Sequence, residues 1–337
     1  MATSRVAIAC QGGGSHTAFT AGALSRLLTE AGDVDVVGLS GTSGGAICAL
    51  LAWNGLVAGR GDPTDALLAF WRDLRASEPW DRLVNDAVVG ALRFWGHWVS
   101  PETSPYDLPW ALLPNALPAL VARHAELDSL PARVSDPSNP LLLISAVGVR
   151  SGEFATFRGG GPLPGSAGGW RPVTLDSILA SAAVPSLFRA VEIDGEPYWD
   201  GLYAQNPPIR ELLDAGPDEL WIVQINPTTS AEVPTRPGTI RDRRNELSAN
   251  LSMQQEVSFI ERINELIDDD LLSEAGRRKY RHVEVRWIRM SASLAARLDF
   301  ESKLDRSPQL IDELIADGRR QAGRFLRERA AAVAGAG

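Results

Sequence analysis

The chain contains few cysteines, since Cys10 and Cys48 are the only two among 337 residues. Both lie in strongly apolar surroundings, and nothing near them has the spacing of metal ligands or of a disulfide framework. We therefore expect two buried, reduced thiols and no bound metal.

The sequence also lacks an excess of positive charge. Its 33 basic and 42 acidic residues give a formal net charge of -9 at pH 7. Such a field repels the phosphates of nucleic acids. We expect no nucleic-acid partner.

Long hydrophobic runs are missing as well. No segment approaches the roughly 18 to 20 uninterrupted apolar residues of a membrane-spanning helix. The first apolar run, Val6 to Ala9, is too short for a signal-peptide core and is followed by glycines. We expect a cytoplasmic protein, for which any contact with membranes would be peripheral.

Short apolar runs alternate with helical patterns along the chain. Strands that are apolar throughout are typical of a parallel sheet covered on both faces. The sequence therefore predicts a three-layer α/β/α fold with a mainly parallel central sheet of about five or six strands. The expected strands are 6–9, 34–39, 141–147, 154–157, 198–199 and 220–225, and the expected helices among them are 15–30, 46–53 and 175–182.

The composition predicts two domains. A linker rich in proline, threonine and serine, Pro227 to Pro237, separates a catalytic domain over residues 1–230 from a mostly helical C-terminal extension over 231–337. Residues 80–121, rich in proline and aromatic residues, are expected to form a helical cap insertion. The extension is expected to contain helices over 241–269 and 308–333 and a strand over 282–290.

Three consecutive glycines, Gly12, Gly13 and Gly14, follow the first expected strand and precede a helix. Their N–H groups can point at an anion with the helix dipole behind them, as in an oxyanion hole. The alternative is a phosphate or nucleotide loop. The sequence lacks both the Lys-Ser/Thr ending of a P-loop and the glycine spacing of a dinucleotide loop.

A G-x-S-x-G pattern, Gly41-Thr42-Ser43-Gly44-Gly45, lies between an expected strand and an expected helix. This context is typical of a nucleophile elbow, in which a sharp turn exposes the serine. Gly41, Gly44 and Gly45 leave room for the chain to fold back tightly. Ser43 is therefore the candidate nucleophile.

A serine nucleophile needs a base, and two candidates follow it in the sequence. His282 would complete the order Ser, acid, His of an α/β-hydrolase, but an elbow after the second strand comes too early for that fold. Asp200 ends a short strand and precedes Gly201, and burial would raise its pKa and its basicity. The alternative for Asp200 is an ordinary Asp-Gly turn.

Taken in order, these motifs resemble the patatin-like phospholipase family over about Arg5 to Ile225. The resemblance implies an oxyanion hole at the glycines, a Ser43–Asp200 dyad, acyl ester substrates such as phospholipids, and no metal or organic cofactor. The chain departs from the family pattern around the glycines at Gln11, His16 and Thr17. The motifs that carry the resemblance are Gln11 to Gly14, Gly41 to Gly45, Ala180 to Pro185, Asp200-Gly201 and Asn206 to Pro208.

We therefore expect a serine acyl hydrolase that forms an acyl-enzyme on Ser43 with Asp200 as base. The alternatives are transfer of the acyl group to another acceptor, cleavage of thioesters or polyesters, and a non-catalytic lipid-binding protein. Residues 243–263 are similar to an extension of some bacterial family members, and suit packing, oligomerisation or a regulatory partner. The cap tryptophans suit either core packing or a membrane-facing lip; they are Trp80, Trp95, Trp98 and Trp110.

Overall fold

The computed structural model describes residues 3–95, 104–107, 116–161, 171–185, 187–230 and 232–335. Its strands are β1 (Ser4–Cys10), β2 (Val34–Gly41), β3 (Leu141–Gly148), β4 (Phe154–Gly159), β5 (Arg171–Pro172), β6 (Val191–Ile193), β7 (Glu196–Asp200), β8 (Glu219–Gln224) and β9 (Glu284–Arg289). Its α-helices are α1 (Ala18–Glu30), α2 (Gly44–Ala58), α3 (Asp65–Leu74), α4 (Pro79–Trp95), α5 (Ala116–His124), α6 (Leu130–Val134), α7 (Leu175–Ser181), α8 (Pro237–Asp268), α9 (Glu274–Lys279), α10 (Ala292–Ala295) and α11 (Pro308–Gly335). Short 3-10 helices are η1 (Gly14–Thr17), η3 (Gly201–Tyr203), η4 (Arg210–Ala215) and η5 (Glu301–Lys303).

All described strands belong to one nine-stranded sheet, whose main order is β5-β4-β3-β2-β1-β8-β9. The five neighbours β3, β2, β1, β8 and β9 run parallel to one another, while β4 and β7 run antiparallel to β3. The predicted α/β class and mainly parallel sheet are confirmed. The expected five or six strands were too few, because β5 and β6 are too short to give a clear sequence signal and because β9, expected in the C-terminal extension, joins the same sheet.

The pairing of β3 explains how β7 reaches the end of β2. Residues 142–147 of β3 pair with β4 along one edge, and residues 141–144 pair with β2 along the other. Because β4 occupies the first edge, β7 pairs with residues 146–148 on the edge that β2 has left free. β7 runs antiparallel to β2, so its last residue, Asp200, arrives where β2 ends at Gly41.

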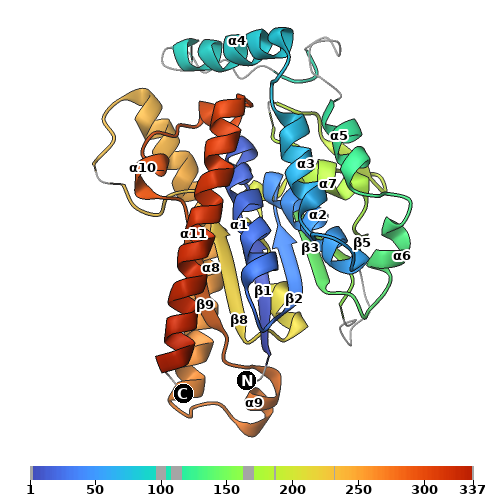
Figure 1. Ribbon diagram of the computed structural model, residues 1–337, viewed down its shortest axis with the longest axis vertical. Helices are drawn as coiled ribbons and strands as arrows, with labels where there is room; N and C mark the ends of the chain where they lie inside the picture. The colour runs from blue at the N-terminus through green and yellow to red at the C-terminus, as the bar shows by residue number, and fades with distance from the viewer. Residues whose placement is uncertain are drawn as a thin grey trace.

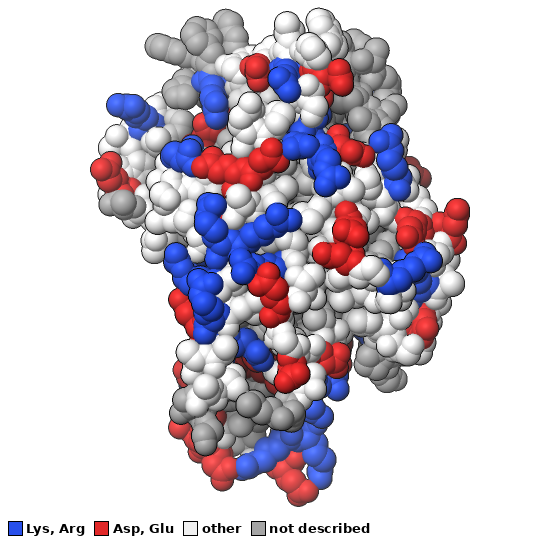
Figure 2. Space-filling view, in the orientation of Figure 1, with Lys and Arg blue, Asp and Glu red and all other residues white. Residues whose placement is uncertain are grey.

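Two apolar cores lie on opposite faces of the sheet, as the alternation of β1 requires. Val6, Ile8 and Cys10 join the core that α1, α2 and α11 cover. Ala7 and Ala9 join the core that α8 and η4 cover. Figure 1 shows α1 and α11 side by side over one face of the sheet. Figure 2 shows acidic and basic side chains distributed together over this outer face.

The C-terminal region contributes to the sheet and to its covering helices. β9 adds a parallel strand beside β8, and α11 packs along α1. Two glycines permit this close packing, because a Cβ at Gly318 would collide with the carbonyl oxygen of Phe19, and one at Gly22 with that of Ile315. The expected helices over 241–269 and 308–333 and the strand over 282–290 correspond to α8, α11 and β9.

The expected cap is described only in part. α4 lies across one end of the molecule, opposite the N-terminus, from which β1 begins (Figure 1). Trp80 is 73% exposed on α4, whereas Trp98, Trp110 and the side chain of Trp95 fall outside the described residues. In the part of the chain that the structure describes, no helix is both long and apolar enough to cross a membrane.

Candidate active site

Ser43 lies in the sharp turn between β2 and α2. Its backbone has φ 57° and ψ −128°, a conformation that a residue with a side chain rarely adopts. The side chain lies directly at the N-terminus of α2 and is mostly buried, at 8% exposure. This is the strained strand-turn-helix geometry that the G-x-S-x-G pattern predicts.

Hydrogen bonds to the turn hold the strained residue in place. The Ser43 N–H donates to Ser181 Oγ at 2.9 Å, and the Thr42 hydroxyl donates to the Gln205 carbonyl oxygen at 2.7 Å. Thr42 Oγ1 also lies 2.6 Å from Ser145 Oγ. Ser181 belongs to the Ala180 to Pro185 motif. One residue of this motif thus accepts the backbone N–H of Ser43 and stabilises the elbow.

The elbow glycines are required by close packing. A Cβ at Gly41 would collide with the Gly45 carbonyl oxygen, and one at Gly44 would collide with Thr17 Oγ1. A Cβ at Gly45 would collide with the carbonyl oxygen of Cys10, at the end of β1. Gly41 therefore lets the turn close on itself, while Gly44 and Gly45 let it lie directly against η1 and the end of β1.

Asp200 lies at the end of β7, beside the elbow. Its side chain is 1% exposed, and Oδ1 accepts a hydrogen bond from the Leu202 N–H at 2.8 Å. Oδ2 is buried and makes no hydrogen bond of regular geometry with the described residues. Burial raises the Asp200 pKa to about 7, while the Leu202 N–H and the neighbouring Ser43 hydroxyl act to lower it. A carboxylate with this pKa is a far better proton acceptor than an exposed aspartate.

The glycine loop lies against Ser43. A Cβ at Gly12 would lie only 3.0 Å from Ser43 Cβ and 2.7 Å from the Thr42 carbonyl oxygen. The Gly12 N–H donates to Asn206 Oδ1 at 2.7 Å, so this donor is occupied. Among the described residues, the N–H groups of Gly13 and Gly14 have no hydrogen-bond partner. The sequence-based assignment gave all three glycines to the oxyanion hole, and the structure leaves only the second and third N–H groups unoccupied.

Each described histidine contacts a polar side chain other than Ser43. His16 is buried with Nε2 2.8 Å from Ser302 Oγ, and burial, together with the charge of Lys303, lowers its pKa to about 3. His124 Nε2 lies 3.0 Å from Asp73. His97 falls outside the described residues.

His282 lies at the other end of the sheet from Ser43. It precedes β9, whose first residue pairs with Glu219 at the start of β8, whereas Ser43 follows the end of β2. A strand of six or seven residues separates these ends by about 20 Å. The His282 side chain instead approaches Asp268 at 3.7 Å. The position of His282 therefore agrees with its exclusion as the base.

A sequence comparison decides the family. The model of the family described as patatin-like phospholipase matches residues 8–131 and 173–213. The chain belongs to the patatin-like phospholipase family. The matched ranges contain the glycine loop, the Ser43 elbow and Asp200, and family membership supports lipid acyl hydrolase activity in general.

Two further comparisons add little to this. VipD from Legionella pneumophila is a structure similar to this chain, with a TM-score of 0.43 and 14% sequence identity; the alignment covers 97% of this chain and 67% of VipD. A comparison with curated proteins gave no match.

A network of buried amide side chains supports the glycine loop of this patatin-like chain. Asn206, which holds the Gly12 N–H, donates from Nδ2 to the Ala249 carbonyl oxygen at 3.2 Å. Gln11 Oε1 accepts the N–H of Asn226 at 2.8 Å, and Gln11 Nε2 donates to Asn250 Oδ1 at 2.9 Å. α8 thus supports the loop through Ala249 and Asn250.

α8 also anchors the segment after Asp200. Glu256 accepts the N–H groups of Ile209 and Arg210 at 2.7 and 2.8 Å, and Gln205 Nε2 at 2.9 Å. The sequence analysis assigned none of these α8 residues to the site. A buried glutamate or asparagine on a long helix looks like any polar helix residue until its partners are known.

No candidate metal centre accompanies these residues. Within the described ranges, no group of three or more histidine, cysteine, aspartate or glutamate side chains is placed to hold a metal ion. Cys10 and Cys48 are free and buried, as the sequence predicted.

Proposed function

We propose that the protein is a lipid acyl hydrolase that cleaves carboxylic esters through an acyl-enzyme on Ser43. The observation that carries the proposal is a strained serine beside a buried aspartate whose pKa burial raises to about 7. No histidine among the described residues hydrogen-bonds to this serine. The family match makes a lipid ester the natural substrate class.

In this mechanism Asp200 accepts the proton of the Ser43 hydroxyl while the oxygen attacks the ester carbonyl carbon. The N–H groups of Gly13 and Gly14 stabilise the negative charge that develops on the carbonyl oxygen. The tetrahedral intermediate collapses, and the alcohol leaves with the proton from Asp200. Asp200 then takes a proton from a water molecule, whose oxygen attacks the acyl carbon. The second tetrahedral intermediate collapses by breaking the bond to Ser43 Oγ, the carboxylic acid leaves, and Asp200 returns its proton to the Ser43 oxygen.

The nearly neutral pKa of Asp200 suits both halves of this cycle. A general base works best when its pKa lies near the operating pH, because it is then both ionised and basic. After it has taken the serine proton, the same carboxyl group is acidic enough to protonate the departing alcohol. Burial of Asp200 therefore supplies the basicity that histidine supplies in a triad.

We also propose that α4 contacts the lipid surface. Trp80, Leu83, Val84 and Val88 are exposed on this helix at 73%, 58%, 38% and 47%, while Val89 is buried against the protein. Rings and branched apolar side chains of this kind insert into the boundary between head groups and acyl chains.

Vesicle binding tests this contact. Replacing Trp80 and Leu83 by Ser should weaken flotation with phosphatidylcholine vesicles, without loss of hydrolysis of a water-soluble ester. Unchanged vesicle binding would contradict it.

Hydrolysis of a medium-chain p-nitrophenyl ester by the full chain tests the proposed mechanism. Ser43→Ala and Asp200→Asn should each lower kcat by about a thousandfold or more. The matched controls are His282→Ala and His97→Ala, which should keep wild-type kcat. Loss of activity in either histidine variant, or activity retained by Ser43→Ala, would refute the Ser–Asp mechanism. Product analysis with competing alcohols would separate hydrolysis from acyl transfer.

A further inference from the structure

Lysine is rare in this chain, and one of its lysines lies beside the glycine loop. Only Lys279 and Lys303 occur among the 33 basic residues. Lys279 is exposed on α9, at the end of the molecule where both chain termini lie (Figure 1). Lys303 is the last residue of η5, and a Cβ at Gly14 would lie 3.2 Å from Lys303 Cβ. Its backbone therefore packs directly against the third glycine of the loop.

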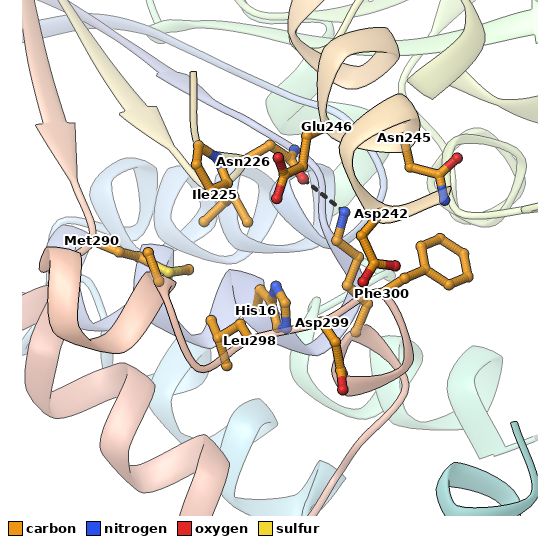
Figure 3. A pocket seen from close by; sticks show the side chains of 13 residues that line it. His16, Ile225, Asn226, Asp242, Asn245, Glu246, Met290, Leu298, Asp299 and Phe300 are labelled. Atoms are coloured by element: carbon orange, nitrogen blue, oxygen red, sulfur yellow. Dashed lines mark hydrogen bonds between the residues drawn. The ribbon is translucent and has the colours of Figure 1, made fainter. Parts of the chain in front are cut away.

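The Lys303 side chain reaches the loop through one amide. Nζ donates to Asn226 Oδ1 at 2.7 Å, the hydrogen bond drawn in Figure 3. Asn226 Nδ2 in turn donates to the Gly12 carbonyl oxygen at 3.3 Å. The Gly12 carbonyl and the Gly13 N–H belong to the same peptide group. Two hydrogen bonds thus link Lys303 to the oxygen side of the peptide whose N–H group is the proposed oxyanion donor.

The ammonium group lies in a small pocket with four other titratable side chains. His16 extends from η1, Asp242 and Glu246 from α8, and Asp299 from the segment before η5 (Figure 3). His16 is neutral, since burial holds its pKa at about 3. Loss of solvent lowers the Lys303 pKa to about 8, while Glu246 and Asp242 act to raise it.

Arginines compete for two of these carboxylates. Glu246 pairs with Arg243 at 2.9 Å, and Asp299 pairs with Arg93 at 2.9 Å. Within the described part of the chain, Lys303 itself forms no ion pair. The Lys303 ammonium group instead donates to the neutral amide of Asn226, which in turn donates to the Gly12 carbonyl oxygen.

We propose that Lys303 is a positioning residue that presents the Gly13 N–H to the developing oxyanion through Asn226. The proposal rests on the proposed function, and it makes the C-terminal region a component of the active site. Because Nζ can only donate, the Asn226 side-chain oxygen must face Lys303. The Asn226 NH2 group therefore faces the Gly12 carbonyl oxygen. Hydrogen bonds in such a chain polarise one another, which strengthens the Gly13 N–H as a donor.

The expected effect lies in kcat rather than in KM. An oxyanion donor interacts more strongly with the transition state than with the neutral ester, so weakening it slows the chemical step. Removing a single oxyanion donor costs about 100- to 1000-fold in kcat, so weakening one through Lys303→Met should cost about 10- to 100-fold. Because Lys303 does not touch the ester, KM should stay within about twofold.

The experiment measures kcat and KM of the full chain on a p-nitrophenyl ester for Lys303→Met, Lys303→Arg and the matched control Lys279→Met. Lys303→Arg keeps the charge and should retain most of the wild-type kcat, while Lys279→Met should equal wild type. The wild-type kcat should also fall above about pH 8 as Lys303 loses its proton, and this fall should be absent from both Lys303 variants. Thermal melting of each variant verifies that it is folded.

A double-mutant cycle with Asn226→Ala tests the path. If Lys303 acts through Asn226, the double variant should be no slower than the slower single variant. Wild-type kcat in Lys303→Met, or additive losses in the double variant, would overturn the proposal. Failure of the proposed function is recognised separately, because it appears in Ser43→Ala or in the histidine variants whatever the Lys303 variants do.

Discussion

Asp200 should destabilise the folded protein at neutral and alkaline pH, and Asp200→Asn should relieve this. Its folded pKa of about 7 lies above the ordinary value of 3.8, because the carboxylate is buried. The folded state therefore holds the proton more tightly than the unfolded state, so stability falls as the pH rises from about 4 to about 7. The gap of about three pKa units corresponds to about 4 kcal/mol above pH 7.

Asparagine keeps the shape of the side chain without the charge. Its Oδ1 can still accept the Leu202 N–H that Asp200 Oδ1 now accepts. Asp200→Asn should therefore be more stable than wild type by about 4 kcal/mol near pH 9, and by only about 2 kcal/mol near pH 5. Urea unfolding of both proteins at the two pH values measures this difference.

The decisive quantity is how the difference in free energy of unfolding between Asp200→Asn and wild type changes with pH. All other titrating groups are present in both proteins, so a change in this difference reports on Asp200. The control is Asp128→Asn, at a carboxylate that is exposed in the folded protein, for which the difference from wild type should stay constant. A stability difference for Asp200→Asn that is equal near pH 5 and near pH 9 would refute a buried carboxylate with a raised pKa.

Three further predictions concern catalysis and the turn. Because Asp200 must be ionised to act as a base, kcat/KM should rise with pH through about 7, and an enzyme equally active near pH 5 would contradict this. Gly12→Ala should lower kcat at least about tenfold, because its Cβ would lie 3.0 Å from Ser43 Cβ; Gly90→Ala, at a helix position with open space, should match wild type in the same assay. Ser181→Ala leaves the buried Ser43 N–H without its acceptor and should cost about 1–3 kcal/mol in urea unfolding, and an unchanged midpoint would count against this contact.

The sequence predicted those parts of the site whose chemistry restricts both residue type and local structure. A nucleophile elbow needs small residues around a serine between a strand and a helix, so the G-x-S-x-G pattern together with its strand-turn-helix context predicts Ser43 as the nucleophile. The glycine loop was found in the same way. Asp200 before a glycine could equally be an ordinary turn, and the resemblance of the motif order to the patatin-like family made it the candidate base. Only the pairing of β7 with β3 brings it beside Ser43.

The rest of the site depends on contacts between residues far apart in the sequence. The occupied Gly12 N–H follows from Asn206, which lies 194 positions away, and no local pattern indicates such a pair. Lys303 stands in a polar segment that reads as surface, and only the packing of η5 against Gly14 brings it near the loop. An amphipathic pattern predicted that α8 and α11 would each bury a face, but not which face of the sheet each would cover.

Identification of the acylated residue tests the central claim most directly. The full chain would be mixed with a p-nitrophenyl ester, quenched in acid within milliseconds to seconds, digested, and mapped by mass spectrometry. The account predicts one added acyl group, on the peptide that contains Ser43, and none in Ser43→Ala. An acyl group on any other residue, or turnover of the ester by Ser43→Ala, would contradict it.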